Sequence, residues 1–248
     1  MEILLSNDDG VNAPGLAAHA SVLAELGNIH VVAPEGDRSA FSHALTLEKP
    51  LAPRKIANGF ISLNGTPADC VHLALNGMLG FTPDLVVAGI NAGANLGDDV
   101  IYSGTVAAAM EGRFLNSLSI AVSVVGANPQ YYDVAARITL NVIRQLPDLS
   151  IPAHTVLNIN VPDLPAEQIK GIKVTRLGSR GPAEDVVEVI NPRGRANYWI
   201  GAAGKEEDAG PGTDFYAVRQ GFVSITPLHA DMTDYKSIDS MGDWVNHF

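Results

Sequence analysis

The chain has 248 residues, of which 46% are hydrophobic and 17% charged, a balance typical of a folded globular protein rather than a disordered one. A formal net charge of −11 argues against broad contact with a polynucleotide, which requires clustered Lys and Arg. No apolar run approaches membrane-spanning length and the acidic N-terminus does not resemble a secretory signal, so we expect a cytoplasmic protein with no membrane partner. The single cysteine, Cys70, excludes an internal disulfide.

The first two thirds of the chain alternate short β-rich runs with helical patterns. Such alternation is typical of βαβ units and predicts an α/β fold with a mainly parallel sheet. The expected strands cover residues 3–6, 29–33, 85–88, 120–125 and 156–161, and the expected helices cover 14–26, 68–79, 105–115 and 132–146.

After Pro162 the helical periodicity fades, and Gly, Pro and charged residues increase. Candidate strands lie at 171–175, 198–201 and 222–226, with an antiparallel hairpin near 183–202. A final helix within 231–248 would have an apolar stripe of Ile238, Met241, Trp244 and Val245. We therefore expect one domain over 1–248, with 163–248 as a β-rich C-terminal elaboration.

The tetrapeptide Asn7-Asp8-Asp9-Gly10 follows directly after the first apolar run. Sheets of this class bind ligands beyond the carboxyl ends of their strands, which is where this carboxylate pair falls. Adjacent strand residues point to opposite faces, so both carboxylates can reach one cation only if the backbone turns, which Gly10 permits. Taken alone, the tetrapeptide favours an ordinary Asx turn, and the rest of the chain reverses that preference.

Three further polar segments follow predicted strands or begin a helix, at 34–43, 89–99 and 102–105. Because the carboxyl ends of parallel strands meet at one edge, we expect these segments to lie beside Asp8 and Asp9. Mg²⁺ and Mn²⁺ take oxygen ligands from carboxylates, hydroxyls and amides. The donors of that kind are Asp8, Asp9, Ser39 and Asn91.

Several other kinds of site are disfavoured. There is no zinc-ligand spacing, no glycine fingerprint for a dinucleotide, no P-loop and no G-x-S-x-G elbow. His43 is the one histidine in these segments, and we favour a loop role over a catalytic one. Ser103-Gly104-Thr105 at a helix start fits either a helix cap or an anion site, and the two roles are compatible.

The order of these motifs resembles the SurE family of survival proteins. The matching residues are Asn7-Asp8-Asp9-Gly10, Arg38-Ser39, Asn64-Gly65-Thr66-Pro67, Gly89-Ile90-Asn91-Ala92-Gly93-Ala94-Asn95-Leu96-Gly97, Tyr102-Ser103-Gly104-Thr105-Val106, Leu157-Asn158-Ile159-Asn160-Val161-Pro162 and Gly212-Thr213-Asp214. Several long segments in the same order are more specific than any single motif.

This resemblance implies a Rossmann-like three-layer sandwich and a metal-dependent 5'/3'-nucleotidase that hydrolyses nucleoside monophosphates, with possible action on short polyphosphate. It implies Asp8, Asp9, Ser39 and Asn91 as ligands of Mg²⁺ or Mn²⁺, and contacts to phosphate from Asn95, Ser103, Gly104 and Thr105. It also implies a cytoplasmic homodimer or homotetramer built partly by C-terminal segments. Ala40-Phe41 is a departure from the Gly-rich loop that is more usual there, and it bears on loop flexibility and base selectivity.

The expected chemistry follows from the residue types. A cation held by the four oxygen donors would bind phosphate, and Asp8 or Asp9 would orient or deprotonate the attacking water. An aspartyl-phosphate intermediate is the competing route. A metal-dependent nucleotide sensor without turnover is the alternative function.

Overall fold

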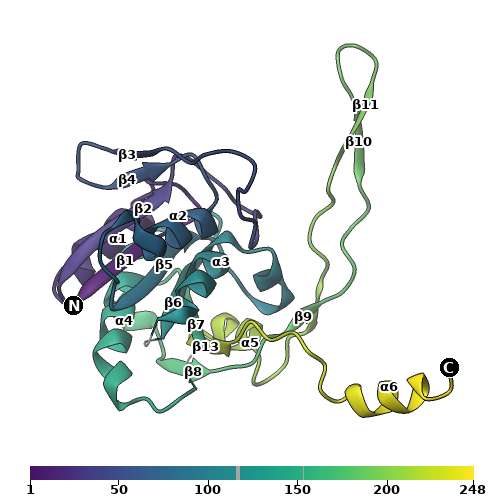
Figure 1. The fold of residues 1–248 in the computed structure, drawn as a ribbon. Helices are drawn as coiled ribbons and strands as arrows, with labels where there is room; N and C mark the ends of the chain where they lie inside the picture. Colours follow the sequence, from purple (N-terminus) through teal and green to yellow (C-terminus); the bar gives the residue numbers. More distant parts are fainter. Residues whose placement is uncertain (116–117, 153) are drawn as a thin grey trace.

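The computed structural model describes residues 1–115, 118–152 and 154–248, and its centre is a large twisted sheet (Figure 1). The order of strands across this sheet is β3-β4-β2-β1-β5-β6-β7-β13-β8. In chain order they are β1 (Glu2–Ser6), β2 (Asn28–Pro34), β3 (Pro53–Lys55), β4 (Ile61–Leu63), β5 (Leu85–Ala92), β6 (Ser119–Val125), β7 (Val156–Pro162), β8 (Ile172–Val174) and β13 (Val223–Leu228).

The six strands from β4 to β7 run parallel, as predicted. The edges differ, since β3 is antiparallel to β4 and β13 is antiparallel to β7. The first strand pairs with both neighbours in matching register, Ile3 lying opposite Ile29 and Leu85. The carboxyl ends of the parallel strands therefore meet along one rim of the sheet.

Helices cover both faces and give the expected three layers. The helices α1 (Pro14–Leu23) and α4 (Tyr132–Gln145) share one core with Ile3 and Leu5 of β1. On the opposite face, α2 (Pro67–Leu73) and α3 (Gly104–Glu111) pack on Leu4. This alternation of Ile3, Leu4 and Leu5 between two apolar layers is what a strand buried on both faces requires.

The C-terminal part adds small elements beside the sheet. They are β9 (Ser179–Arg180), β10 (Val187–Ile190), β11 (Ala196–Trp199), β12 (Glu206–Asp208), α5 (Asp214–Arg219) and α6 (Ile238–Val245). The antiparallel hairpin of β10 and β11 confirms the one predicted near 183–202, and it projects far from the body in Figure 1. The helix α6 confirms the predicted final helix and lies on an arm leading away from the sheet.

Several predicted boundaries were wrong, for identifiable reasons. The helix expected to reach residue 79 ends as an α-helix at Leu73, and non-helical backbone follows at Asn76 and Gly77. The helix expected to reach Leu115 ends at Glu111 and continues as a 3₁₀ turn. The strand expected to end at residue 88 continues to Ala92, because its pairing with β6 resumes at Asn91 after an irregularity that follows Ala88.

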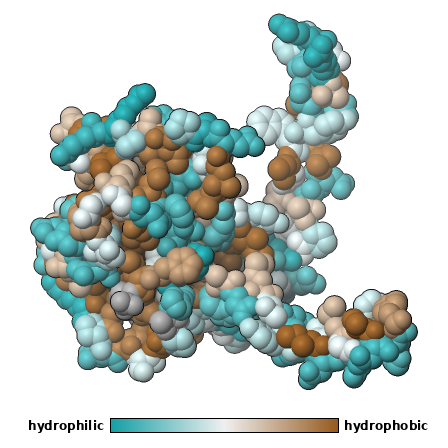
Figure 2. Space-filling view, in the orientation of Figure 1, coloured by the Kyte–Doolittle hydropathy of each residue, from teal (hydrophilic) through white to brown (hydrophobic). Residues whose placement is uncertain are grey.

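The surface carries apolar residues at both extensions. Four apolar side chains of α6 are at least half exposed, namely Ile238, Met241, Trp244 and Val245. Apolar residues are visible on this arm at the lower right of Figure 2. In the described ranges, none of the helices combines the length and the apolarity needed to cross a membrane.

Candidate functional site

The chain turns immediately after β1, and this turn places the two predicted carboxylates. The side-chain amide of Asn7 donates to the carbonyl of Gly10 at 2.9 Å, and Gly10 has a φ of 101°. Such a φ is readily available only to glycine, so the predicted role of Gly10 is confirmed. Asp8 is buried and accepts a hydrogen bond from the hydroxyl of Thr105, whereas Asp9 accepts one from the backbone N–H of Ala92 at 3.0 Å.

The two carboxylates are therefore anchored on different elements at the same rim, Asp8 on α3 and Asp9 on the end of β5. Burial raises the pKa of Asp8 to about 6, with a further contribution from the negative charge of Asp9. Burial also raises the pKa of Asp9, and the charge of Asp37 adds to that effect. Asp8 and Asp9 each therefore feel the negative charge of one neighbouring carboxylate in addition to burial.

The loop after β2 brings Ser39 and Asp37 to this rim. Both the hydroxyl and the backbone N–H of Ser39 donate to Asp37 Oδ1, at 2.6 and 2.8 Å. The backbone N–H of Arg38 donates to the carbonyl of Asp8 at 2.8 Å, which ties the loop to the end of β1. Sequence reasoning did not single out Asp37, because an Asp two residues before a Ser is an ordinary turn pattern.

Asn91 and Asn95 lie at the end of β5 and in the loop beyond it. The amide of Asn91 donates to the carbonyl of Gly93 at 2.9 Å. Asn95 is buried, and its amide donates to the hydroxyl of Ser123 at 2.7 Å. Both predicted residues therefore belong to the same rim as Asp9.

Two asparagines on β7 hold the backbone of Asn95. The amide of Asn160 accepts from the Asn95 N–H and donates to the Asn95 carbonyl, both at 2.9 Å. Asn158 donates to the same carbonyl at 2.9 Å. Sequence reasoning did not assign these residues a function, although two fully buried Asn side chains on alternate positions of an apolar strand are an unusual pattern.

Ser103, Gly104 and Thr105 begin α3 and pack directly against Asp8. The Ser103 hydroxyl accepts from the N–H of Val106 at 3.0 Å, so the cap reading is confirmed for this residue. A Cβ on Gly104 would lie 2.9 Å from Asp8 Oδ2, which shows how closely this helix start approaches the carboxylate. A phosphate reaching these N–H groups would lie beside Asp8.

The donor set fits a hard cation by its chemistry. Within the described residues no three His, Cys, Asp or Glu side chains group as a complete metal site, so a cation would also need hydroxyl or amide oxygens. Ser6 Oγ and Asn7 Oδ1 are buried at the end of β1 and have no hydrogen-bond partner among the described residues. A buried acceptor without a partner destabilises the fold, and these two oxygens at the end of β1 remain free to bind a ligand.

Other acidic residues near the rim have structural roles. Asp98 accepts from the backbone N–H of Arg180, and Asp99 accepts from its guanidinium at 2.8 Å. The buried carboxylate of Asp214 accepts from the N–H of Gly97 at 2.7 Å and from the N–H of Gly178 at 2.9 Å. These contacts hold the segment between Asn95 and Ser103 in place. The sequence did not predict this structural role for Asp214.

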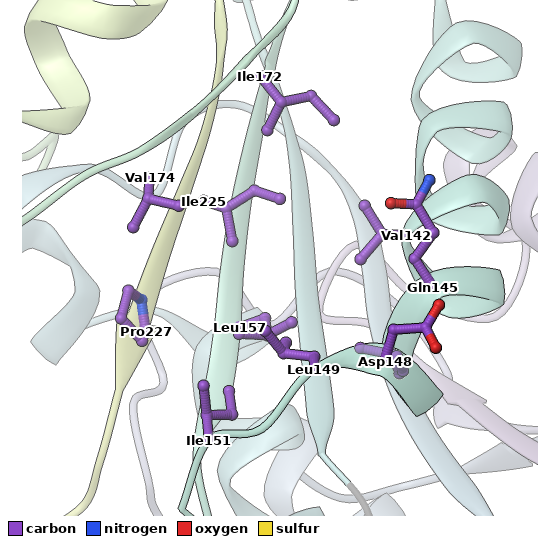
Figure 3. A pocket seen from close by; sticks show the side chains of 11 residues that line it. Val142, Gln145, Asp148, Leu149, Ile151, Leu157, Ile172, Val174, Ile225 and Pro227 are labelled. Atoms are coloured by element: carbon purple, nitrogen blue, oxygen red, sulfur yellow. The ribbon is translucent and has the colours of Figure 1, made fainter.

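Two apolar hollows lie away from the carboxylates. One, of about 480 Å³, lies between the end of α4 and strands β7, β8 and β13, and its lining is almost wholly apolar (Figure 3). The other, of about 640 Å³, includes His43 with Glu111 and Arg113. Neither includes any of the predicted ligands, and His43 lines the second hollow.

Fold and site together define a three-layer α/β protein with an acidic, oxygen-rich rim beside a helix N-terminus. The family model described as Survival protein SurE matches residues 3–184. The chain belongs to the SurE family.

Individual relatives are similar over almost the whole chain. A protein named 5'-nucleotidase SurE from Methylococcus capsulatus is 54% identical, the alignment covering 99% of this chain and 98% of that one. One of the same name from Coxiella burnetii is 56% identical, over 99% and 95% of the two chains. The crystal structure of the SurE protein from Aquifex aeolicus matches with a TM-score of 0.85 and 46% identity, over 97% and 98%.

Proposed function

We propose that this protein is a metal-dependent phosphomonoesterase that hydrolyses nucleoside 5'- and 3'-monophosphates to nucleoside and phosphate. The observation that carries the proposal is the contact between the buried carboxylate of Asp8 and the first turn of α3. It joins a cation-binding group to an anion-binding group, which phosphoryl transfer requires. The relatives named 5'-nucleotidase SurE support this substrate class.

Asp8, Asp9, Ser39 and Asn91 are the residues that would hold Mg²⁺ or Mn²⁺. When bound, such a cation would neutralise charge on the phosphate oxygens and lower the pKa of a water ligand. The hydrogen bond from Thr105 of α3 to Asp8 and the one from Ala92 of β5 to Asp9 give the two carboxylates separate supports, which would orient them before substrate arrives.

Asn95, Ser103, Gly104 and Thr105 are the groups that we assign to the phosphate. The N–H groups at the start of α3 point outward from the helix, and its dipole favours negative charge there. The hydrogen bonds from Asn158 and Asn160 would hold the backbone of Asn95 in place for this contact.

One of the two carboxylates would orient or deprotonate the attacking water. Single-turnover hydrolysis in ¹⁸O-labelled water tests direct attack, which places the label in phosphate alone. Label in an Asp side chain would contradict direct attack, because it requires water to open an aspartyl phosphate at its carbonyl carbon. An aspartyl phosphate opened at phosphorus also labels phosphate alone, and retention of configuration at a chiral phosphorus would identify that route.

The function itself is tested by the release of inorganic phosphate from a panel of nucleoside 5'- and 3'-monophosphates, with and without a chelator. We expect release that stops with chelator and returns with Mn²⁺ or Mg²⁺. Tight nucleotide binding without release would identify a sensor instead. Short polyphosphate belongs in the same panel, since its terminal group has similar chemistry.

The assembly and location that we propose are a cytoplasmic homodimer or homotetramer. The exposed apolar stripe of α6 and the projecting hairpin support self-association, because large apolar patches on a protein surface commonly mark interfaces.

A further inference from the structure

The loop that follows β2 lies against the turn that follows β1. The backbone N–H of Arg38 donates to the carbonyl of Asp8 at 2.8 Å. A Cβ added to Gly10 would lie only 2.9 Å from the Cα of Gly36, so the two backbones are in direct contact. Ser39 follows one residue after the bond to Asp8, and this places it beside the turn that carries both predicted carboxylates.

Within this loop, a single oxygen of Asp37 accepts both hydrogen bonds that Ser39 donates. The hydroxyl of Ser39 lies 2.6 Å from Asp37 Oδ1, and its backbone N–H lies 2.8 Å from the same atom. An ionised carboxylate has only acceptor oxygens, so the hydroxyl is the donor. The proton of the hydroxyl is therefore directed at Asp37, and the lone pairs of Ser39 Oγ are directed elsewhere.

A neutral hydroxyl that binds a cation needs this arrangement. The hydroxyl binds through a lone pair of its oxygen, while its proton points at another acceptor. A group that accepts the proton of a metal ligand orients that ligand and makes it a stronger donor. Asp37 supplies such an acceptor to Ser39.

The other three predicted ligands each have an orienting partner of their own. These partners are the hydroxyl of Thr105 for Asp8, the N–H of Ala92 for Asp9, and the carbonyl of Gly93 for the amide of Asn91. Asp37 gives Ser39 the corresponding partner, so each of the four oxygen donors is oriented by a group of the chain.

We propose that Asp37 is a positioning residue that orients Ser39 as a ligand of a divalent cation. This inference rests on the proposed function and adds to it a residue that acts through Ser39. Asp37 could instead be a ligand itself, or act only by its negative charge. Orientation differs from both in one respect, because without the Ser39 hydroxyl there is nothing for Asp37 to orient.

A double-mutant cycle measures this dependence on Ser39. Calorimetric titration with Mn²⁺ gives the dissociation constant for the wild type, Asp37→Ala, Ser39→Ala and the double variant. Asp37→Ala should weaken Mn²⁺ binding by about tenfold, as the loss of a partner of a metal ligand does. In the Ser39→Ala background, the same change should alter the dissociation constant by less than about twofold.

Two further variants separate orientation from charge. Asp37→Asn removes the charge but keeps an oxygen that accepts from Ser39, so its Mn²⁺ affinity should stay within about threefold of the wild type. Glu35→Ala is the matched control, because it removes an exposed carboxylate from the same loop. The backbone N–H of Glu35 keeps its bond to the carbonyl of Leu63, and the Mn²⁺ affinity should not change.

The Mn²⁺ affinity is measured without turnover, so this test is separate from that of the proposed function. The expected pattern of affinities in a protein that releases no phosphate would leave the role of Asp37 intact and contradict the proposed function alone. An unchanged affinity in Asp37→Ala would overturn the inference. So would an equal loss with and without the Ser39 hydroxyl, or a wild type that binds no Mn²⁺.

Discussion

Asp8 is buried beside Asp9 and accepts a hydrogen bond from Thr105. Its burial and the charge of Asp9 make the ionised carboxylate destabilising in the folded protein. Its folded pKa of about 6 lies above the ordinary value of 3.8, so its contribution to stability is present at low pH and is lost as pH rises through about 6. A metal that binds the ionised carboxylate would offset that loss.

Asp8→Asn should therefore make the metal-free protein more stable at pH 8, by about 3 kcal/mol, because an amide needs no ionisation and can still accept from Thr105. Urea unfolding of both proteins at pH 8 and at pH 4 measures the difference, which should shrink at the lower pH. A variant that is less stable than the wild type at pH 8 would contradict the burial argument.

His19 is a second buried titratable residue, and it lies on α1. It is fully buried on α1, its Nε2 lies 3.3 Å from the hydroxyl of Thr139, and that hydroxyl itself donates to the carbonyl of Ala135. The ring is neutral at pH 7, since burial disfavours its charged form. Burial lowers the pKa of His19 from 6.5 to about 4.

Because the folded pKa is lowered, the stability from neutral His19 is complete above pH 6.5 and is lost as pH falls toward 4. The loss should be about 3 kcal/mol, and His19→Gln should remove most of it. Chemical unfolding at pH 7 and pH 4.5 tests this expectation. Equal pH dependence in the two proteins would show that His19 is not responsible.

At the scale of elements, strand β7 positions the loop that follows β5. Asn160→Ala would remove both hydrogen bonds to the Asn95 backbone and leave its N–H buried. We expect a loss of about 2 kcal/mol in stability and about a tenfold fall in kcat/KM, with Mn²⁺ affinity unchanged because the metal donors lie elsewhere.

Ser224→Ala provides the control for this variant. Ser224 lies opposite Asn160 on β13, is equally buried, and has a hydroxyl without a hydrogen-bond partner among the described residues. Its removal should leave kinetics unchanged. If Asn160→Ala and Ser224→Ala behave alike in thermal melts and kinetics, β7 does not position the loop.

The elements that could be predicted are those whose apolar pattern is long and regular. The strands β1, β6 and β7 and the helix α4 came out within about two residues, because burial on one or both faces dictates their pattern. The short strands β3 and β4 and the helix α5 were missed, since three to six residues give too little periodicity.

For the candidate site, strand direction alone predicted that Asp8, Asp9, Ser39 and Asn91 follow strand ends at one rim of the sheet, and their joint binding of a cation stays a prediction. It could not predict Asn158, Asn160 or Asp214 as supports. Their partners are backbone groups, and every residue has a backbone carbonyl whatever its side chain, so the sequence does not indicate which ones are paired.

At the scale of the whole molecule, the projecting hairpin is joined to the site segment. Arg180, in β9 at the base of the hairpin, contacts both Asp98 and Asp99. Asp98 and Asp99 lie between Asn95 and Ser103, so Arg180 links the base of the hairpin to the segment that carries the proposed phosphate contacts. A partner that moved the hairpin would act on this segment.

The C-terminal arm is expected to mediate self-association, because the apolar stripe of α6 is left exposed within its own chain. Removal of residues 231–248 should reduce the assembly to a smaller species in sedimentation velocity experiments. Trp244→Ser tests the stripe alone and should weaken association in the same direction. An unchanged sedimentation coefficient in both variants would exclude this role for the arm.

We propose that the rim formed by β1, β5 and α3 hydrolyses nucleotides with the help of a cation. The most direct test is phosphate release from adenosine 5'-monophosphate during titration with Mn²⁺, after metal removal, in the wild type, Asp8→Asn and the exposed control Asp148→Asn. We predict release that rises from zero with Mn²⁺ in the wild type and the control, and stays lower by at least about 100-fold in Asp8→Asn. Equal release from all three proteins, or release without any metal, would contradict the account.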